Sequence, residues 1–222
     1  GYTNTDSFIL LTKSRQFFLT DYRYSEQAEN ECSGFEIITV NKDAKPLECV
    51  IADIFKGDGL TILGFEEKYL VVQLMDKLRN AMPQIEFLPA GDIFENTRFV
   101  KSEQEISHIQ TAARIADKAF ELILGFIEPG MTEAKVAWQL ETFMRDLGAE
   151  SSAFEILLPS GKRTSLPHGA PTQKKIETGD FITMDFGALV EGYRSDMTRT
   201  VVVGTPDEKQ KKIYSIVQEA QQ

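Results

Sequence analysis

Cysteine, histidine and tryptophan are scarce in this sequence of 222 residues, which has two, two and one of them. Cys32 and Cys49 have no partners at metal-ligand spacing, and a scaffold of disulfides would need more of them. We therefore expect two small buried thiols and a reducing, cytoplasmic setting. With only His108 and His168, a histidine-rich zinc site is excluded, so any metal would be held mainly by carboxylates, which favour hard cations.

Long hydrophobic runs and an excess of positive charge are also missing. Apolar runs are far shorter than the roughly 20 residues of a membrane-spanning helix, and no secretory signal pattern is visible. The 24 Lys+Arg residues against 34 Asp+Glu give a net charge of −10, which argues against binding to a nucleic-acid backbone. Apolar residues reach 42%, too many for a disordered chain. We expect a folded protein that binds neither a membrane nor a nucleic acid.

The first part of the chain alternates short strand-like and helix-like segments. Phe8–Leu11 and Phe17–Thr20 flank a polar stretch and predict a hairpin. The pattern also predicts strands at 35–40, 61–65 and 85–88, and helices at 22–31, 46–56 and 66–80. This alternation favours an α/β domain with a mixed sheet, which we assign to residues 1–97.

A second domain, assigned to residues 98–222, begins with a helix signature. Ser102 and Glu105 form a capping box, in which each side chain accepts from the other residue's backbone N–H. Apolar residues at spacings of three and four then continue the helix up to Pro129 and Gly130. The members of this stripe are Ile106, Ile109, Ala113, Ala116, Phe120, Ile123 and Ile127.

Thr132 caps a second predicted helix, which ends at Gly148. The residues that it turns inward are Val136, Leu140, Phe143, Met144 and Leu147. From residue 153 the pattern changes to strands and glycines, and residues 207–222 form a helix again. The second domain is therefore expected to be α+β.

Two aspartates lie in an expected hairpin over residues 181–204. Glycines bound the connecting segment, and we expect a loop somewhat longer than two residues. If the turn is centred between residues 190 and 191, Asp185 and Asp196 stand directly opposite each other, with Cβ atoms about 4.5–5.5 Å apart. The alternation places both aspartates on a polar face and an apolar set on the other face.

Opposed like charges destabilise a hairpin unless something neutralises them. The repulsion at 4 Å is about 1 kcal/mol in water and several-fold larger near a protein interior. A divalent cation between the carboxylates would remove it, whereas the alternative is a polar face solvated by water. His168 lies nearby in Ser165–Pro171, a loop bounded by prolines, and is either functional or a plain turn histidine.

These segments resemble the motifs of the pita-bread metallopeptidases, in the branch of Xaa-Pro aminopeptidases and Xaa-Pro dipeptidases (prolidases). The motifs stand at Leu166–Gly169, Gly179–Asp180, Met184–Ala188 and Gly192–Thr200. Upstream, Phe17–Ala28 resembles the creatinase/prolidase N-terminal domain, and residues 98–120 resemble the opening helix of the catalytic domain. The resemblance covers nearly the whole chain. It implies a mixed-sheet creatinase/prolidase-type domain followed by the first half of an α+β pita-bread domain.

The resemblance assigns roles to four residues. Asp185 and Asp196 match two ligands of a pair of divalent metal ions, usually Mn²⁺ or Co²⁺ in this branch, with Zn²⁺ as a further option. His168 matches the catalytic histidine that contacts the substrate, and Thr198 would support the ligands from behind. The implied reaction is hydrolysis of the bond between an N-terminal residue and a following proline, in di- or oligopeptides, by a homodimer.

The family's other ligands, one histidine and two glutamates, have no match here, so we expect them beyond residue 222. Residues 1–4 look like a loop interior to the N-terminal domain. We therefore expect a chain that is truncated at both ends and inactive by itself.

Two other interpretations stay open. The first is a non-catalytic binding or structural protein that keeps the pita-bread scaffold. The second is a creatinase-like hydrolase that acts on a non-peptide, although such enzymes need no metal and the aspartate pair argues against them. A methionine aminopeptidase fits less well, because those enzymes lack the separate N-terminal domain.

Overall fold

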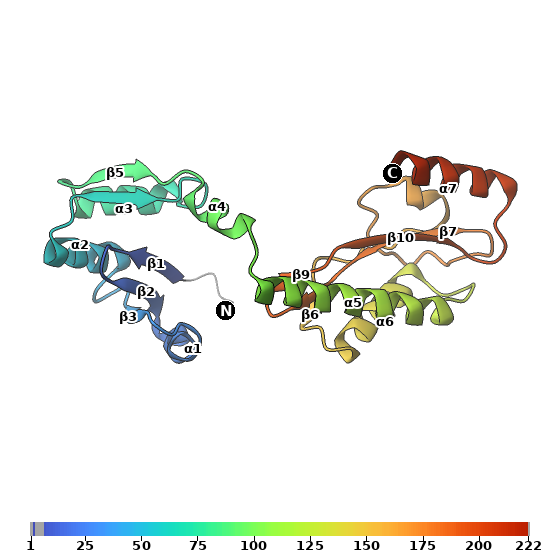
Figure 1. The fold of residues 1–222 in the computed structure, drawn as a ribbon, viewed down its shortest axis with the longest axis horizontal. Coiled ribbons are helices and arrows are strands. Elements are labelled where there is room, and N and C mark those ends of the chain that lie inside the picture. The colour runs from blue at the N-terminus through green and yellow to red at the C-terminus, as the bar shows by residue number, and fades with distance from the viewer. Residues whose placement is uncertain (1, 3–6, 222) are drawn as a thin grey trace. The chain divides into compact units, whose positions relative to one another are not determined.

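The computed structural model describes residue 2 and residues 7–221, which fall into two compact units (Figure 1). One unit ends at Val100 and the other begins at Lys101. Each unit has its own cluster of buried apolar side chains.

The first unit contains a mixed three-stranded sheet. β1 (Ser7–Leu11) pairs antiparallel with β2 (Gln16–Asp21), and β3 (Glu36–Val40) pairs parallel with β2. A parallel pair is formed by β4 (Ile62–Phe65) and β5 (Glu86–Pro89). The helical elements are η1 (Tyr22–Tyr24), α1 (Ser25–Glu31), α2 (Leu47–Asp58), α3 (Val72–Ala81) and α4 (Ile93–Phe99). The predicted hairpin and mixed α/β architecture are confirmed.

Two details of this unit differ from the sequence-based expectation. The helix expected from residue 66 begins only at Val72, because the preceding residues form a turn in which the N–H groups of Tyr69 and Leu70 donate to Glu66 O at 3.1 and 2.9 Å. The prediction of two buried thiols is wrong. Cys32 follows the end of α1 and is half-buried, while Cys49 lies on the outer side of α2 and is exposed; both are free thiols.

The second unit begins with two helices that the sequence anticipates. In α5 (Glu103–Phe126), Ser102 Oγ accepts from Glu105 N at 3.3 Å and Glu105 Oε2 accepts from Ser102 N at 2.6 Å, which confirms the capping box. The buried face of α5 differs from the predicted stripe and consists of Ala112, Ile115, Ala116, Ala119 and Ile123. Ala112 is buried in place of Ala113, because this side of α5 packs against the hairpin, where Ser195 Oγ donates to Ala112 O at 3.1 Å.

The second helix is α6 (Glu133–Asp146), and Thr132 Oγ1 accepts from Lys135 N at 3.2 Å, as a helix cap does. Val136, Leu140 and Met144 are buried as predicted, whereas Leu147, beyond the last turn, is exposed. Gly148 has a φ of +105° and ends the helix.

The strands of the second unit form an interrupted hairpin. β7 (Phe181–Phe186) pairs antiparallel with β10 (Met197–Val202), and β8 (Ala188–Val190) pairs with β9 (Tyr193–Arg194) and with β6 (Ser151–Ser152). Ile182, Met184 and Phe186 turn into the core with the buried faces of α5 and α6. The connection to β7 contains the short η2 (Gly161–Ser165), and the chain continues after β10 into α7 (Glu208–Gln221).

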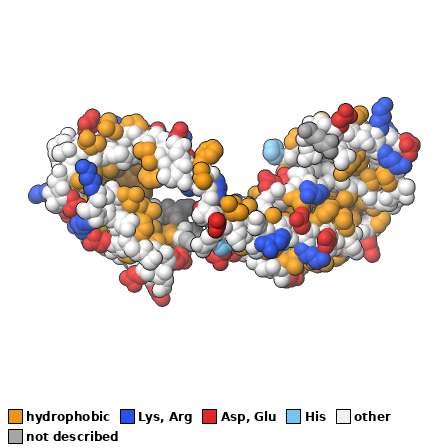
Figure 2. Space-filling model, viewed as in Figure 1, with side chains coloured by type: hydrophobic (Ala, Val, Ile, Leu, Met, Phe, Trp, Pro, Cys, Tyr) orange, Lys and Arg blue, Asp and Glu red, His pale blue; other side chains and the backbone are white. Residues whose placement is uncertain are grey.

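The surface carries a mixture of charges. On the face drawn in Figure 2, acidic and basic side chains are interspersed rather than gathered by sign. Within the described residues no helix is both long and apolar enough to cross a membrane.

Candidate metal centre

The hairpin turn sets the register of the two aspartates. Glu191 and Gly192 both have positive φ, at +50° and +79°, which is the signature of a two-residue type I′ turn. The prediction of a longer loop centred one residue earlier is therefore wrong. Glycine tolerates this conformation without strain, and it lets the strands close more tightly than expected.

The tighter turn shifts the pairing by two residues. Asp185 stands opposite Thr198, so the predicted direct opposition of Asp185 and Asp196 is wrong. A shift of two keeps the alternation of faces. Ser195 and Met197 are buried while Asp196 and Thr198 are exposed, which places Asp196 on the side of Thr198. The two aspartates are thus diagonal neighbours on one face, a relation in which Cα atoms lie about 7–8 Å apart.

A close backbone contact interrupts the hairpin beside Asp196. A Cβ atom on Gly187 would lie 1.8 Å from Ser195 O, so only glycine fits there. Ser195 Oγ accepts from Ala188 N at 2.9 Å and donates to Ala112 O at 3.1 Å. This hydroxyl links the hairpin to α5 where β7 ends, and the sequence analysis, which used Gly187 only as a boundary of the connecting segment, did not predict it.

Asp185 is held by three hydrogen bonds from two sides. Thr198 Oγ1 donates to Asp185 Oδ1 at 3.1 Å across the hairpin. On the opposite edge of β7, Asp185 N and O form a pair of hydrogen bonds with Leu157, both at 2.9 Å. These contacts fix the backbone and one carboxylate oxygen of Asp185, so Oδ2 is the candidate ligand atom.

The chemistry of the two aspartates suits a hard divalent cation. Among the ion pairs of residue 2 and residues 7–221, none involves either carboxylate. The same part of the chain contains no group of three or more His, Cys, Asp or Glu side chains that could hold a metal ion. The residues present therefore fit a partial ligand set of two carboxylates.

His168 lies in an exposed part of the loop after η2. Its neighbour Gly169 is buried, and a Cβ atom there would lie 2.8 Å from Pro159 Cβ. Pro159 O in turn accepts from Thr183 N at 3.2 Å, two residues before Asp185 in β7. The loop backbone beside His168 therefore rests on a segment paired with the strand that carries Asp185.

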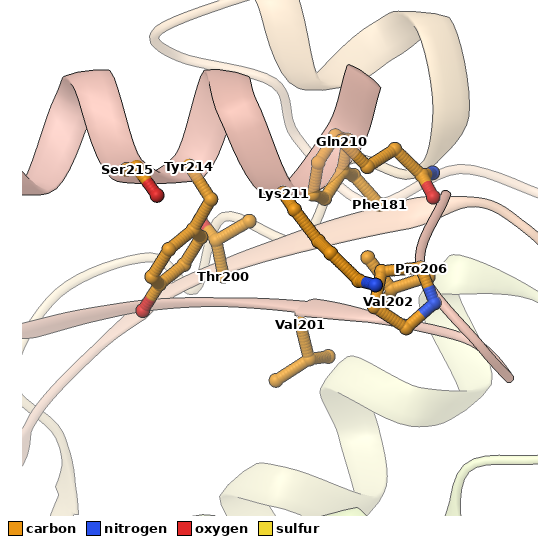
Figure 3. A pocket seen from close by; sticks show the side chains of 9 residues that line it. All are labelled: Phe181, Thr200, Val201, Val202, Pro206, Gln210, Lys211, Tyr214 and Ser215. Atoms are coloured by element: carbon orange, nitrogen blue, oxygen red, sulfur yellow. The ribbon is translucent and has the colours of Figure 1, made fainter. Parts of the chain in front are cut away.

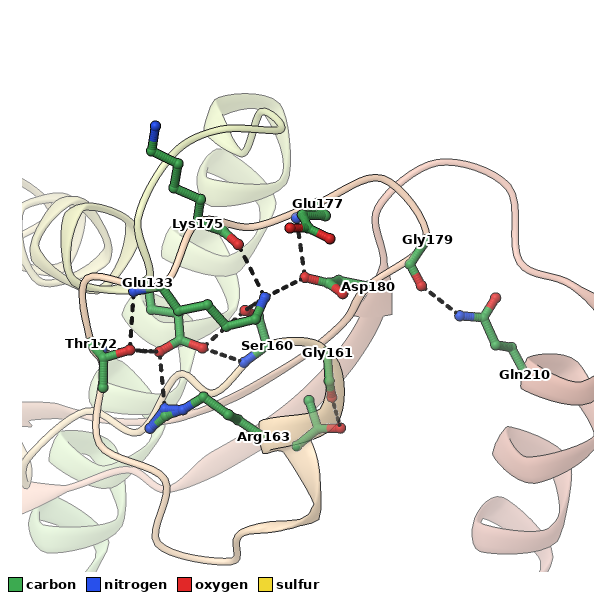
Figure 4. Close-up of polar contacts among 12 residues, drawn as sticks. Glu133, Ser160, Gly161, Arg163, Thr172, Lys175, Glu177, Gly179, Asp180 and Gln210 are labelled. Carbon is green, nitrogen blue, oxygen red and sulfur yellow. Dashed lines mark hydrogen bonds and ion pairs between the residues drawn. The ribbon is translucent and has the colours of Figure 1, made fainter.

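A buried carboxylate that the sequence analysis did not single out joins the two ends of this loop (Figure 4). Glu133, the first residue of α6, has no exposed surface. Its Oε1 accepts from Ser160 N and Oγ at 2.7 and 2.9 Å, and its Oε2 accepts from Thr172 N and Oγ1 at 3.0 and 2.7 Å. Burial raises the pKa of Glu133, but the hydrogen bonds from Thr172 and Ser160 outweigh it and the pKa is lowered. A glutamate directly after a helix cap is so common that its sequence position gave no warning of this role.

An open pocket of about 360 Å³ lies elsewhere in the second unit (Figure 3). It is lined by side chains of β7, β10, α7 and the connection from β10 to α7. These residues are Phe181, Thr200, Val201, Val202, Pro206, Gln210, Lys211, Tyr214 and Ser215. Asp185, Asp196 and His168 are not among them, so this pocket is separate from the candidate metal ligands.

Comparison with known families agrees with this arrangement. Residues 107–222 match the model of metallopeptidase family M24, and residues 1–100 match the creatinase/prolidase N-terminal domain. The chain belongs to metallopeptidase family M24.

Relatives of this M24 chain include peptidases from bacteria and archaea. It is 41% identical to the uncharacterized peptidase YqhT of Bacillus subtilis (strain 168) over 221 residues, which is 100% of this chain and 62% of YqhT. It is 39% identical to an Xaa-Pro dipeptidase of Pyrococcus horikoshii over 216 residues, which is 96% of this chain and 58% of the dipeptidase.

Solved structures show the same fold. An Xaa-Pro dipeptidase from Bacillus anthracis matches with a TM-score of 0.90 and 45% identity, over 99% of this chain and 61% of that one. An X-Pro aminopeptidase from Thermotoga maritima MSB8 matches with a TM-score of 0.88 and 36% identity, over 97% and 59%. The M24 chain thus spans about three fifths of the length of these relatives. The predicted fold, a creatinase/prolidase-type domain followed by part of a pita-bread domain, is confirmed.

Proposed function

We propose that the protein is a metal-dependent peptidase that hydrolyses the bond between an N-terminal residue and a following proline. The observation that carries this proposal is the pair of aspartates on one face of the β7–β10 hairpin, with no basic side chain neutralising them among the described residues. Family membership and the names of relatives, which include Xaa-Pro dipeptidases, support the substrate class.

In this proposal Asp185 and Asp196 are metal ligands. Thr198 holds one oxygen of Asp185 and so directs the other oxygen toward the metal. His168, on its exposed loop, contacts the peptide beside the bond to be cleaved. A pair of divalent ions, when bound, activates water at neutral pH and polarises the scissile carbonyl.

The finer features are part of the same proposal. The carboxylate-rich ligand set favours Mn²⁺ over Zn²⁺, because thiolates are absent from it. The resemblance to prolidases supports a homodimer, and the two free thiols are compatible with a reducing cytoplasm. The remaining ligands, one histidine and two glutamates by resemblance, would come from outside these 222 residues.

The test is an assay of the full-length protein with Xaa-Pro dipeptides and tripeptides in the presence of Mn²⁺. Asp185→Asn and Asp196→Asn preserve side-chain size but remove the charge, and each should abolish hydrolysis and lower the bound metal content. Asp117→Asn is the matched control, since Asp117 is an exposed residue of α5. Full activity in both aspartate variants would contradict the ligand assignment, and a wild type that binds no metal would favour a non-catalytic scaffold.

A further inference from the structure

Glu133 is not needed to begin helix α6. Thr132 Oγ1 already caps the helix by accepting from Lys135 N at 3.2 Å. A fully buried carboxylate is costly unless its oxygens are hydrogen-bonded, and an apolar residue would fill the same volume without that cost. All the donors to Glu133 come from the segment 160–172, so its charge serves that segment rather than its own helix.

Four of these hydrogen bonds come from the residues on either side of what we call the His168 loop, residues 161–171. Ser160 immediately precedes this loop and Thr172 immediately follows it, and each gives both its backbone N–H and its hydroxyl to one oxygen of Glu133. A single carboxylate therefore fixes the separation of the loop ends. The loop between them lies on the surface, with His168 exposed.

Arg163 extends this control into the loop itself. Its Nη1 lies 3.3 Å from Glu133 Oε2, and its Nη2 donates to Ala170 O at 2.9 Å. Ala170 is two residues after His168 in the chain. The guanidinium thus crosses the loop and connects the carboxylate to the backbone beside the histidine.

Ser160 also has support from the other side. Lys174 Nζ donates to Ser160 Oγ at 2.9 Å and to Asp180 Oδ2 at 2.7 Å. Because Pro159, on which Gly169 rests, directly precedes Ser160, the contacts that hold Ser160 also hold the base of the His168 loop.

We propose that Glu133 is a positioning residue that holds the His168 loop closed by binding both of its ends, and so sets the place of the His168 imidazole relative to β7. The effect on catalysis rests on the proposed function, in which His168 contacts the peptide. The effect on the loop does not, and it can be measured in a protein without activity.

The structural test compares Glu133→Gln with Glu128→Gln. Glu128 is an exposed glutamate in the connection that precedes α6. Glutamine keeps the shape of the Glu133 side chain, but it replaces one accepting oxygen with an NH₂ group, which cannot accept from Ser160 or Thr172. Amide hydrogen exchange in 161–171 should be about tenfold faster or more in Glu133→Gln, with exchange in α5 unchanged. The ring signals of His168, identified by NMR through their loss in His168→Ala, should shift in Glu133→Gln and not in Glu128→Gln. Unchanged loop exchange and unchanged ring signals in Glu133→Gln would overturn the inference.

The functional test is a double-mutant cycle with His168→Ala in the full-length protein. Glu133→Gln alone should lower kcat/KM for an Xaa-Pro peptide by about 10- to 100-fold, because misplacing a contact group by about 1 Å can cost that much. In the His168→Ala background the same change should cost less than about threefold. A purely structural role predicts the same loss in both backgrounds, and that result would contradict action through His168.

Two outcomes need a separate readout. If Glu133→Gln does not fold, Thr172→Val removes only one hydroxyl from Glu133 and should reproduce the loop exchange and the non-additive kinetics to a smaller extent. If the wild type does not cleave Xaa-Pro peptides, the proposed function fails alone, and the exchange and His168 signals decide the inference.

Discussion

At the scale of single residues, the candidate centre depends on neighbours that hold a carboxylate in place. Asp185 receives one hydrogen bond from Thr198 and two backbone hydrogen bonds with Leu157, while Glu133 accepts from both ends of the His168 loop. Hydroxyl and amide donors bind one carboxylate oxygen of Asp185 and both oxygens of Glu133, and they fix the orientation of each group. The two carboxylates differ in burial. We therefore expect removal of Asp185 to lower metal binding and removal of Glu133 to lower the stability of the fold.

The first prediction concerns Thr198. Thr198→Val keeps the shape of the side chain but removes the hydroxyl that donates to Asp185 Oδ1. We expect Mn²⁺ affinity of the full-length protein to fall by about 10- to 100-fold, the usual cost of losing a group that orients a metal ligand. Isothermal titration calorimetry measures the Mn²⁺ affinity of both proteins. Thr200→Val on the same strand is the control, because Thr200 contacts Thr183 and not an aspartate, and an equal loss there would contradict the role of Thr198.

The second prediction concerns the pH dependence of stability at Glu133. Its pKa lies below the ordinary 4.5, so the folded state binds a proton less readily than the unfolded state. The stability that the charge contributes is therefore present above about pH 4.5 and is lost as the pH falls through the lower folded-state pKa. We expect Glu133→Gln to cost about 2 kcal/mol of unfolding free energy at pH 7, and this difference from the wild type to shrink below pH 4.5.

Urea unfolding from pH 7 to pH 3 measures this difference. Glu128→Gln should give curves parallel to the wild type at every pH. A difference between wild type and Glu133→Gln that stays constant down to pH 3 would show that the charge of Glu133 does not stabilise the fold.

At the scale of elements, local rules predicted which helices and faces exist, but not how two strands meet. Capping and spacing correctly gave the starts of α5 and α6, because the signal lies within one turn of the helix. The alternation of the β7–β10 hairpin was also correct, since the buried face has a period of two. The predicted register of the hairpin was wrong, because Glu191 adopts a positive φ. Type I′ turns usually have asparagine, aspartate or glycine at such a position, so the sequence did not indicate the turn.

Long-range contacts were the other part that the sequence could not supply. The buried stripe of α5 is displaced from the predicted one because Ala112 approaches the hairpin closely, with its carbonyl bound by Ser195 Oγ. The hydrogen bonds of Glu133 join residues up to 39 positions apart. Nothing in the local pattern around either residue indicates which distant segment will pack there.

The third prediction belongs to the hairpin. Gly187→Ala would place a Cβ atom 1.8 Å from Ser195 O, and a backbone atom cannot move aside cheaply. We expect a loss of at least about 3 kcal/mol of unfolding free energy, the upper end for overpacking, together with loss of metal binding as Asp196 moves. Gly125→Ala is the control, because Gly125 lies in α5 with open space around it and should gain about 0.5–1 kcal/mol. Thermal and urea unfolding of both variants check this, and a Gly187→Ala protein as stable as the wild type would refute the close contact.

At the scale of the whole molecule, the chain has two units with separate cores, and among the described residues no group of three or more His, Cys, Asp or Glu side chains could hold a metal ion. The resemblance to the pita-bread metallopeptidases implies that one histidine and two glutamates of the ligand set lie outside these 222 residues, and the two histidines present lie in α5 and on the exposed loop. Family M24 relatives are longer than this chain, which spans 62% of YqhT and 61% of the Bacillus anthracis dipeptidase. We therefore expect metal binding to depend on residues outside the 222.

The last prediction follows from that ligand count. Residues 1–222 alone should bind Mn²⁺ with a dissociation constant on the order of 10⁻³ M, as weak carboxylate sites do, while the full-length protein binds far more tightly. Two like charges on one face and no third ligand give the ion little beyond electrostatic attraction, so binding to the short chain should also weaken steeply with salt. Manganese electron paramagnetic resonance at low and high salt measures both proteins directly. Asp185→Asn should remove the weak binding in the short chain, whereas equal affinity in the short and full-length proteins would mean that the two aspartates are not part of a larger ligand set.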